Sequence, residues 1–261
     1  MTERQADERS RDEDICFGRN SVRSAIASTP KLCSRVMISE SLSGKEKQET
    51  TNLCRDAGVA WQMVKPALLD ALVTGGRHQG FVVRLSSVPL LEIEDLESRR
   101  ETFPGPDLLL VLDHLQDPQN LGAVARSAEV FGAGAIIIPR RRSALPTSTV
   151  MRTSAGAIAR IPVAGVVNIT RTLEMIKKWG YWIVGLHHES RQILGKTPLP
   201  ERTVLVVGGE DSGISRLATR SCDHLLRIPM VGITGSLNSA TAAAIGMYEW
   251  RRAVDKVVGH E

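Results

Sequence analysis

Three polar, glycine-bearing loops in the second half of the chain each follow an apolar run that is typical of a buried strand. They span residues 113–128, 207–213 and 228–238. Glycines let the backbone pass close to a ligand, and open α/β sheets bind their ligands at the carboxyl ends of the strands. The three loops therefore predict one ligand site that is assembled at the ends of sheet strands.

In the first loop, Asp117-Pro118 ends the strand and Asn120 stands at the expected N-cap of a helix. Arg126 lies one turn after Gly122, whose missing side chain leaves open space beside the guanidinium. Taken alone, this pattern favours a capping Asn followed by a surface Arg. Its occurrence together with the other two loops favours a functional site. The helix should bury a stripe at helical spacing, made of Leu121, Val124, Ala125 and Ala128.

The second loop carries Gly208 and Gly209 directly after a strand, and Glu210 follows them. As a turn alone it is unremarkable, because Glu210 could simply face water. In the third loop, Ser236 and Asn238 open a helix that begins with small side chains. Plain helix capping is the alternative for these two residues.

Four arginines are candidates for binding a polyanion: Arg140, Arg141 and Arg142 follow a strand end, and Arg152 lies further along. Adjacent arginines usually form a solvated loop, but beside a ligand site they form a phosphate clamp equally well. His187-His188 has no Cys or carboxylate partner at metal-ligand spacing, so we interpret the pair as structural and expect no metal.

The elements that must position these residues form an α/β pattern in two parts. Residues 15–87 alternate helix and strand and predict a small domain. Its expected helices span residues 20–28, 45–57 and 66–73, and its strands 35–39, 59–64 and 81–85. Residues 88–107 contain three prolines and a charged middle and predict an inter-domain linker with room for one helical turn. Residues 1–14 predict a disordered tail.

From residue 108 to residue 261 the pattern restarts. Strands are expected at 108–113, 135–138, 181–186, 203–207 and 225–228, and helices at 120–131, 170–179 and 239–254. Strands that are apolar on both faces favour a parallel sheet covered by helices.

Composition excludes several classes of protein. The chain has 261 residues, 42% of them apolar, and no apolar run approaches the length of a membrane span. Its four cysteines are far apart, which favours a reducing cytoplasm. The net charge is +4, and because residues 1–14 carry −3 the remainder carries +7. That surplus is compatible with a polyanionic partner and equally with an ordinary basic protein.

In order, spacing and context, the three loops resemble motifs one to three of the SpoU (TrmH) family of RNA ribose 2′-O-methyltransferases. The resemblance covers about residues 107–255. It implies a C-terminal SPOUT-type parallel sheet with a trefoil knot, S-adenosylmethionine as cofactor, RNA as partner and a homodimer. Gly18-Arg-Asn-Ser-Val-Arg and His78-Gln-Gly resemble the N-terminal RNA-binding domain of the RlmB-like branch, which methylates a guanosine of 23S rRNA.

The resemblance assigns roles residue by residue. The catalytic set is Asn120, Arg126, Glu210, Ser236 and Asn238, and the cofactor-binding set is Gly208, Ile228, Met230 and Leu237. The family commonly reads Ser-Leu-Asn-Val-Ser, whereas this chain has Ala240 at the last place, so we expect lost or relocated capping rather than lost catalysis.

A guanidinium stays protonated in proteins and is a poor proton acceptor. We therefore expect Arg126 to bind the phosphate next to the target ribose and to stabilise the developing alkoxide. Two alternatives remain open. The same chemistry could act on tRNA or serve as a ribosomal antibiotic-resistance methylase, or the scaffold could be a non-catalytic RNA-binding or ribosome-assembly protein.

Overall fold

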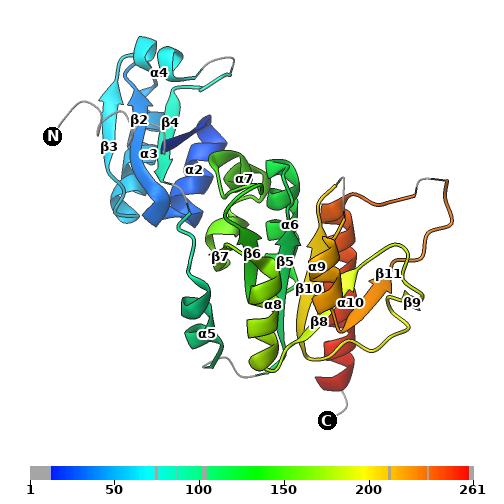
Figure 1. The fold of residues 1–261 in the computed structure, drawn as a ribbon. Helices are drawn as coiled ribbons and strands as arrows, with labels where there is room; N and C mark the ends of the chain where they lie inside the picture. Colours follow the sequence, from blue (N-terminus) through cyan, green and yellow to red (C-terminus); the bar gives the residue numbers. More distant parts are fainter. Residues whose placement is uncertain are drawn as a thin grey trace. The chain divides into compact units, whose positions relative to one another are not determined.

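The computed structural model describes residues 13–73, 76–86, 88–101, 105–210, 213–233 and 235–258. The chain divides into two compact units. One unit comprises Met1–Val88 with Pro146–Ala159, and the other comprises Pro89–Leu145 with Arg160–Glu261. Figure 1 labels their helices and strands.

The first unit is built on a four-stranded sheet in the order β1-β4-β2-β3. Its strands are β1 (Glu13–Phe17), β2 (Cys33–Ser39), β3 (Trp61–Val64) and β4 (Phe81–Ser86), and its helices are α2 (Arg19–Ser28), α3 (Gly44–Asp56), α4 (Pro66–Leu72) and α7 (Ser148–Thr153), with short 3-10 turns at Pro30–Leu32 and Ala157–Ala159. Successive strand residues alternate between faces. Met37 and Val82 accordingly pack with Leu69 of α4, while Val36 and Val83 are buried on the opposite face.

The two short motifs of the first unit lie side by side. The amide of Gly18 donates to the Phe81 carbonyl at 3.0 Å, and the amide of Arg19 donates to Oε1 of Gln79 at 3.1 Å. The ring of His78 supports the turn, since its Nδ1 accepts from the amide of Gly80 at 3.0 Å. Residues that are sixty positions apart therefore form one corner of the sheet.

The second unit contains a seven-stranded sheet in the order β7-β6-β5-β10-β8-β11-β9, and all of its strand pairings are parallel. Its strands are β5 (Asp107–Asp113), β6 (Ala135–Pro139), β7 (Val163–Val166), β8 (Trp182–Leu186), β9 (Gln192–Ile193), β10 (Arg202–Gly208) and β11 (His224–Arg227), and its helices are α5 (Ile93–Glu101), α6 (Pro118–Val130), α8 (Ile169–Lys178), α9 (Arg216–Ser221) and α10 (Ser239–Val258). The predicted parallel α/β sheet is confirmed.

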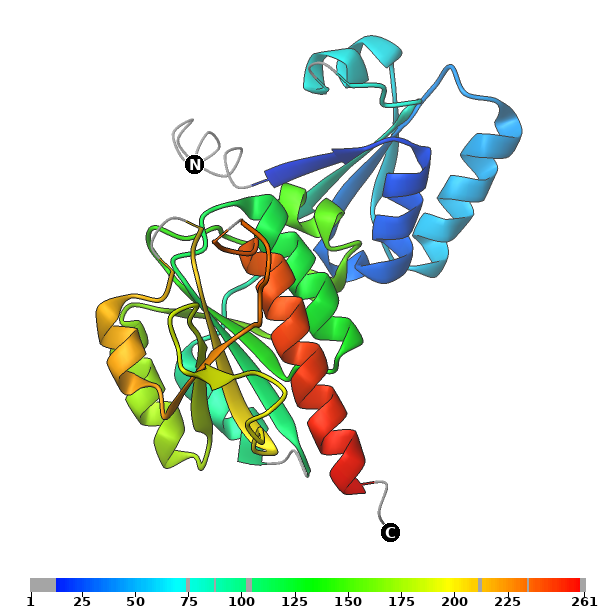
Figure 2. The same cartoon turned by 90° about the vertical axis from the view of Figure 1, so that its right-hand side faces the viewer.

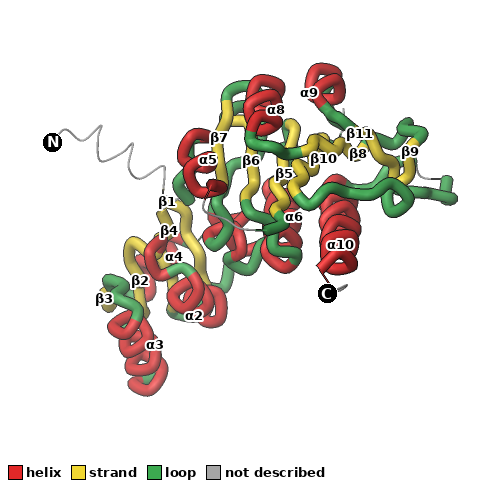
Figure 3. Tube along the Cα trace, turned by 90° about the horizontal axis from the view of Figure 1, so that it is seen from below, coloured by secondary structure: helices red, strands yellow, loops and turns green. Residues whose placement is uncertain are grey.

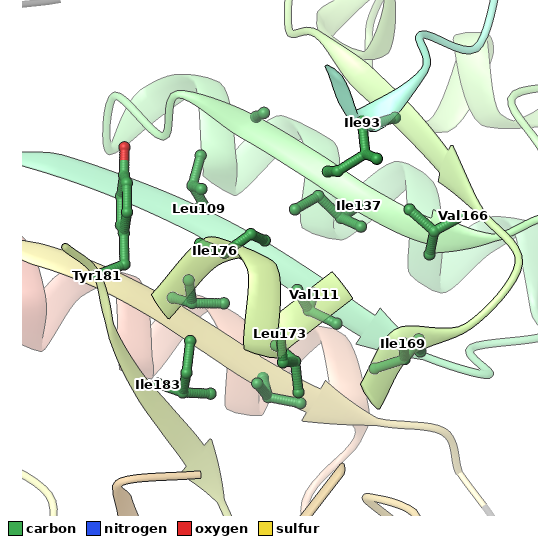
Figure 4. Close-up of a cluster of buried hydrophobic side chains, with 14 of the residues drawn as sticks. Ile93, Leu109, Val111, Ile137, Val166, Ile169, Leu173, Ile176, Tyr181 and Ile183 are labelled. Atoms are coloured by element: carbon green, nitrogen blue, oxygen red, sulfur yellow. The ribbon is translucent and has the colours of Figure 1, made fainter. Parts of the chain in front are cut away.

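Helices cover both faces of this sheet. Figure 3 shows α5, α8 and α9 on one face and α6 and α10 on the other. On the first face, Leu173 and Ile176 of α8 pack against Leu109, Ile137 and other strand side chains (Figure 4). Burial on both faces explains why the strands are apolar throughout.

Helices α6 and α10 pack against each other on the second face, as Figure 2 shows from the side. The predicted stripe of α6 is confirmed, because all four of its members are buried. In α10 the buried residues recur at helical spacing: Ala240, Ala243, Met247, Trp250 and Val254. A Cβ at Gly246 would lie 2.7 Å from Leu205 Cδ2, so this glycine permits close contact between α10 and the sheet.

The segment between β8 and β10 contacts two neighbouring elements of the second unit. It pairs through β9 with β11, where Arg227 lies opposite Ile193. It then passes α10, where the indole Nε1 of Trp250 donates to the Pro200 carbonyl at 3.2 Å. The β8–β10 connection therefore contacts both β11 and α10.

Two expectations need correction. Glu13 and Asp14 were assigned to a disordered tail but belong to β1, because Ile15 and Phe17 pack into the core of the first unit and β1 pairs with β4. Residues 1–12 lie outside the described part. Much of the expected linker belongs to the second unit, since Leu91 pairs with Ala164 and Ile93 of the nine-residue helix α5 is buried in the core.

Among the described helices, none has the length and apolarity needed to cross a membrane.

Candidate active site

The start of α6 differs from the expectation in a way that matters for chemistry. Asp117, not Asn120, is the N-cap: its side chain accepts from the amide of Gln119 at 2.8 Å, and Pro118 occupies the first helical position. Proline is favoured there because its missing N–H has no partner to lose. Asn120 is thus released from capping and can use its amide group elsewhere.

A chain of hydrogen bonds joins the three predicted loops. Nδ2 of Asn238 donates to Oδ1 of Asn120 at 2.9 Å, and Nδ2 of Asn120 donates to Oε1 of Glu210. Asn238 follows β11, Asn120 lies in the first turn of α6 after β5, and Glu210 follows β10. The structure therefore brings together one polar residue from each loop, as the sequence predicts.

Asn238 also caps α10 through its Oδ1 atom. This oxygen accepts from the amides of Ala240 at 2.9 Å and Thr241 at 3.2 Å. Capping and a place in the site coexist in one side chain. The neighbouring hydroxyl of Ser239 is buried and donates to the Gly208 carbonyl at 2.9 Å. A serine hydroxyl next to Ala240 thus ties the third loop to the second.

A pocket of about 290 Å³ lies beside this chain of hydrogen bonds. All four predicted cofactor-binding residues line it, together with two of the predicted catalytic residues: Gly208, Ile228, Met230, Leu237, Glu210 and Ser236. The lining comes from the ends of β8, β10 and β11 and from the first turn of α10. This is the position that parallel sheets use for ligands.

Two glycines at the pocket permit backbone contacts that no other residue could make. A Cβ at Gly208 would lie 1.9 Å from the carbonyl carbon of Gly213, and one at Gly209 would lie 2.6 Å from the carbonyl oxygen of His114. The amide of Gly209 donates to the Asp113 carbonyl at 3.0 Å. The loop after β10 is therefore held against the loop after β5 through backbone atoms.

Arg126 is exposed on α6, two turns after the N-cap. Within the described residues no ion pair or hydrogen bond holds its guanidinium. It is thus available to a ligand, although no contact in the protein positions it. Asp113, at the end of β5, is 1% exposed and accepts from the amide of Ser215 at 2.7 Å.

The four predicted RNA-binding arginines are divided between the two units and differ in their contacts. The guanidinium of Arg140 already contacts other groups of the protein. Its Nε donates to the Gly165 carbonyl at 2.9 Å and its Nη2 contacts Glu92 at 2.5 Å. Arg141 and Arg142 are exposed. Arg152 lies on α7 in the first unit, where it lines a hollow with Cys16.

Part of the pocket was not predicted from the sequence. His187 and His188, interpreted as structural, line it beside Leu186, and their rings stack with centroids 5.2 Å apart. Their position directly after β8 was a usable signal, because every other lining loop also follows a strand end. Among the described residues, no three His, Cys, Asp or Glu side chains cluster in a way that could hold a metal.

Comparison with known proteins agrees with this geometry. The model of the SpoU rRNA methylase family matches residues 107–248, and a model described as RNA 2′-O ribose methyltransferase substrate binding matches residues 15–90. The chain is 38% identical over 232 residues to the 23S rRNA (guanosine-2′-O-)-methyltransferase RlmB of Xylella fastidiosa, covering 89% of this chain and 93% of the relative. It is 37% identical over 246 residues to a protein of Mycolicibacterium vanbaalenii that is named as an uncharacterized tRNA/rRNA methyltransferase, covering 92% of this chain and 77% of that relative.

Among solved structures, the SpoU methyltransferase AviRb from Streptomyces viridochromogenes, in complex with AdoMet, superposes with a TM-score of 0.75 at 20% identity, covering 97% of this chain and 94% of AviRb. This likeness shows the fold. The chain belongs to the SpoU rRNA methylase family. The predicted family and enzyme class, an RNA 2′-O-methyltransferase, are confirmed.

Proposed function

We propose that this protein transfers a methyl group from S-adenosylmethionine to a ribose 2′-hydroxyl in ribosomal RNA, and that the target is a guanosine of 23S rRNA. The observation that carries the proposal is the hydrogen-bonded series Asn238, Asn120 and Glu210 beside the strand-end pocket. Relatives that carry both units are named for this reaction.

The pocket fits the cofactor. Its glycine-rich walls expose backbone groups, and Ile228, Met230 and Leu237 add apolar surface for an adenosine and a methionine chain. These residues and Gly208 would hold S-adenosylmethionine, whose sulfonium supplies an activated methyl group. The solved AviRb complex holds AdoMet on the same fold.

The polar residues would orient the target hydroxyl. Glu210 and Asn120 already share a hydrogen bond, so their remaining lone pairs and N–H groups present donors and acceptors in a fixed arrangement. Positioning of this kind contributes several kcal/mol to catalysis, on the order of 7 or more when reacting atoms are well aligned. Ser236, on the pocket wall, would assist at the same place.

Arg126 would bind the phosphate next to the target ribose and stabilise the alkoxide as its proton leaves. A guanidinium keeps its charge and presents a planar set of donors that matches phosphate. Its exposed position, without a partner among the described residues, leaves it available for that contact. Arg141, Arg142 and Arg152 would contribute further phosphate contacts.

We also propose that the chain forms a homodimer and that its C-terminal unit is a trefoil knot. The contacts of the β8–β10 connection with β11, through Ile193, and with α10, through Trp250, support the knot. The fully exposed Val231 and Ile233 support the dimer, because apolar side chains on a loop favour burial against a partner. A cytoplasmic location follows from a ribosomal substrate.

The function is tested by methyl transfer from radiolabelled S-adenosylmethionine to total RNA from cells that lack the protein. The labelled RNA is separated by size and mapped for 2′-O-methylation. Label in one guanosine of 23S rRNA is the expected result. Label in tRNA would keep the chemistry and replace the substrate. An absence of label, together with an absence of cofactor binding, would leave a non-catalytic RNA-binding protein.

A further inference from the structure

The pocket around Gly208, in which we propose that the cofactor binds, is called the cofactor pocket below. A second pocket lies at the carboxyl edge of the same sheet, on the other side of β5 from it. The sheet order puts β6 and β7 on one side of β5 and puts β10, β8 and β11 on the other. The volume of this second pocket is about 400 Å³, which lies in the range of roughly 300–1,000 Å³ that is typical of ligand sites. Its walls are His114, Pro139, Arg140, Arg141, Arg142, Val167 and Ile169.

His114 is held in this pocket by a buried carboxylate. Its Nδ1 lies 2.6 Å from Oδ1 of Asp113, whose other oxygen accepts the amide of Ser215 at 2.7 Å. An ionised carboxylate only accepts hydrogen bonds, so Nδ1 carries the proton. In the neutral ring, Nε2 on the opposite edge is then an acceptor. The imidazole is 43% exposed, and no partner of Nε2 occurs among the described residues.

The backbone around the pocket is strained at two positions. His114 has φ of 61° and Arg142 has φ of 56°, which is the left-handed region that non-glycine residues rarely occupy. The two strained loops are tied together: the hydroxyl of Ser143 and the amide of Ala144 both donate to the Leu115 carbonyl, at 3.1 and 2.7 Å. Strain that neighbouring contacts maintain is characteristic of functional sites.

The three arginines of the pocket differ in whether the protein already pairs them. Arg140 forms an ion pair with Glu92 and a hydrogen bond with the Gly165 carbonyl, so it is held in place as part of the pocket wall. Arg141 and Arg142 are exposed, and no ion pair within the described chain neutralises either of them. Val167 adds an apolar surface that is 91% exposed. The pocket thus combines two available cations, one oriented acceptor and one apolar patch.

We propose that this pocket binds a ribonucleotide that flanks the methylated one. Arg141 and Arg142 bind its phosphate, Nε2 of His114 accepts a hydrogen bond from its 2′-hydroxyl, and Val167 packs against its sugar or base. This inference rests on the proposed function in one respect, namely that the substrate is RNA. The 2′-hydroxyl distinguishes RNA from DNA, so His114 would contribute to that selection as a positioning residue.

The test is a 2′-deoxy scan of a synthetic RNA around the mapped methylation site. Each of the three or so nucleotides on either side is replaced in turn by its 2′-deoxy form, and the Kd of each RNA is measured with wild type and with His114→Asn. Asn tolerates the left-handed backbone, so folding is preserved. His224→Asn, in β11 and stacked on Trp182, is the matched control.

With wild type and with His224→Asn, one deoxy position should raise Kd about fivefold to tenfold, the size of one lost hydrogen bond. With His114→Asn, the same position should have no further effect. Arg141→Ala combined with Arg142→Asn should raise Kd for every RNA about tenfold and weaken its salt dependence. The affinity for S-adenosylmethionine should be unchanged in all variants.

Identical deoxy profiles in wild type and His114→Asn would overturn the ribose contact, and an unchanged Kd in the double arginine variant would overturn the phosphate contact. Both outcomes can occur while wild type still methylates RNA, so they leave the proposed function intact. Wild type that neither binds nor methylates RNA would overturn the proposed function as well.

Discussion

The two pockets at the carboxyl edge of the C-terminal sheet are lined by different kinds of groups. The cofactor pocket is formed by glycines, backbone groups and a few apolar side chains around Gly208. The pocket on the far side of β5 is formed by His114 and arginine side chains. The series of Asn120, Glu210 and Asn238 lies beside the first pocket.

The ligands that we propose for the two pockets differ in a matching way. A small cofactor of fixed shape is held by backbone groups, whose positions depend on close packing and on the absence of side chains. A polyanion is held by long cationic side chains, whose contribution depends on salt. Substitutions in the first pocket should therefore weaken cofactor binding, and substitutions in the second should weaken RNA binding.

The largest effect is expected from Gly208→Ala. The new Cβ would lie 1.9 Å from a carbonyl carbon and 2.2 Å from the amide of Ile214, so the loop after β10 must move. We expect a loss of roughly 3 kcal/mol or more in the free energy of unfolding and no measurable cofactor binding by calorimetry. Gly44→Ala, where the Cβ meets nothing within 4 Å, should behave as wild type. Wild-type affinity in Gly208→Ala would show that the close approach is unimportant.

Arg126→Ala should lower kcat about a hundredfold to a thousandfold, because it removes a fixed charge near the developing alkoxide. The cofactor Kd should change less than about twofold, since Arg126 is exposed on α6 and does not line the pocket. Single-turnover methyl transfer and calorimetry measure the two quantities. A loss of cofactor binding would instead assign Arg126 a structural role.

Asn120→Asp should lower kcat by about tenfold to a hundredfold. The substitution removes the N–H group that donates to Glu210 and puts two carboxylates in contact, which is unfavourable when both are ionised. Asn168→Asp is the control, because Asn168 caps α8 by accepting from the amide of Arg171 at 3.0 Å and Asp caps equally well. Equal activity in both variants would contradict the role of the hydrogen-bonded series.

Ser239→Ala should have the smallest effect. It removes the buried bond to the Gly208 carbonyl and should lower the free energy of unfolding by about 1–2 kcal/mol, with a modest weakening of cofactor binding. Ser127→Ala, whose exposed hydroxyl bonds within α6, should change stability by less than about 0.5 kcal/mol. Thermal unfolding with and without cofactor measures both.

The parts that sequence alone predicted are those in which a local pattern determines the structure. The stripe of α6 follows from helical spacing, and the place of the site at the strand ends follows from strand-loop-helix order. The four residues expected to bind the cofactor were implied by the resemblance of the loops to the SpoU family. The cap of α6 was assigned wrongly because Asp117 and Asn120 are both good capping residues and only the position of Pro118 distinguishes them. Strand β1 was missed because its pairing partner β4 is more than sixty residues away.

The pocket around His114 could not be predicted because it depends on two loops that are joined only in three dimensions. The sequence marks Arg140 to Arg142 as one run, yet Arg140 is used internally through Glu92. Which arginine is available depends on tertiary contacts, and so does the imidazole orientation that Asp113 imposes.

One paired binding experiment tests the division between the two pockets most directly. The Kd for S-adenosylmethionine and the Kd for the RNA substrate are both measured for wild type, for Gly208→Ala and for the Arg141→Ala, Arg142→Asn double variant. We expect Gly208→Ala to lose the cofactor and keep RNA, and the arginine variant to lose RNA affinity and keep the cofactor. Folded variants that each lose both ligands, or a pattern with the two losses exchanged, would contradict the account.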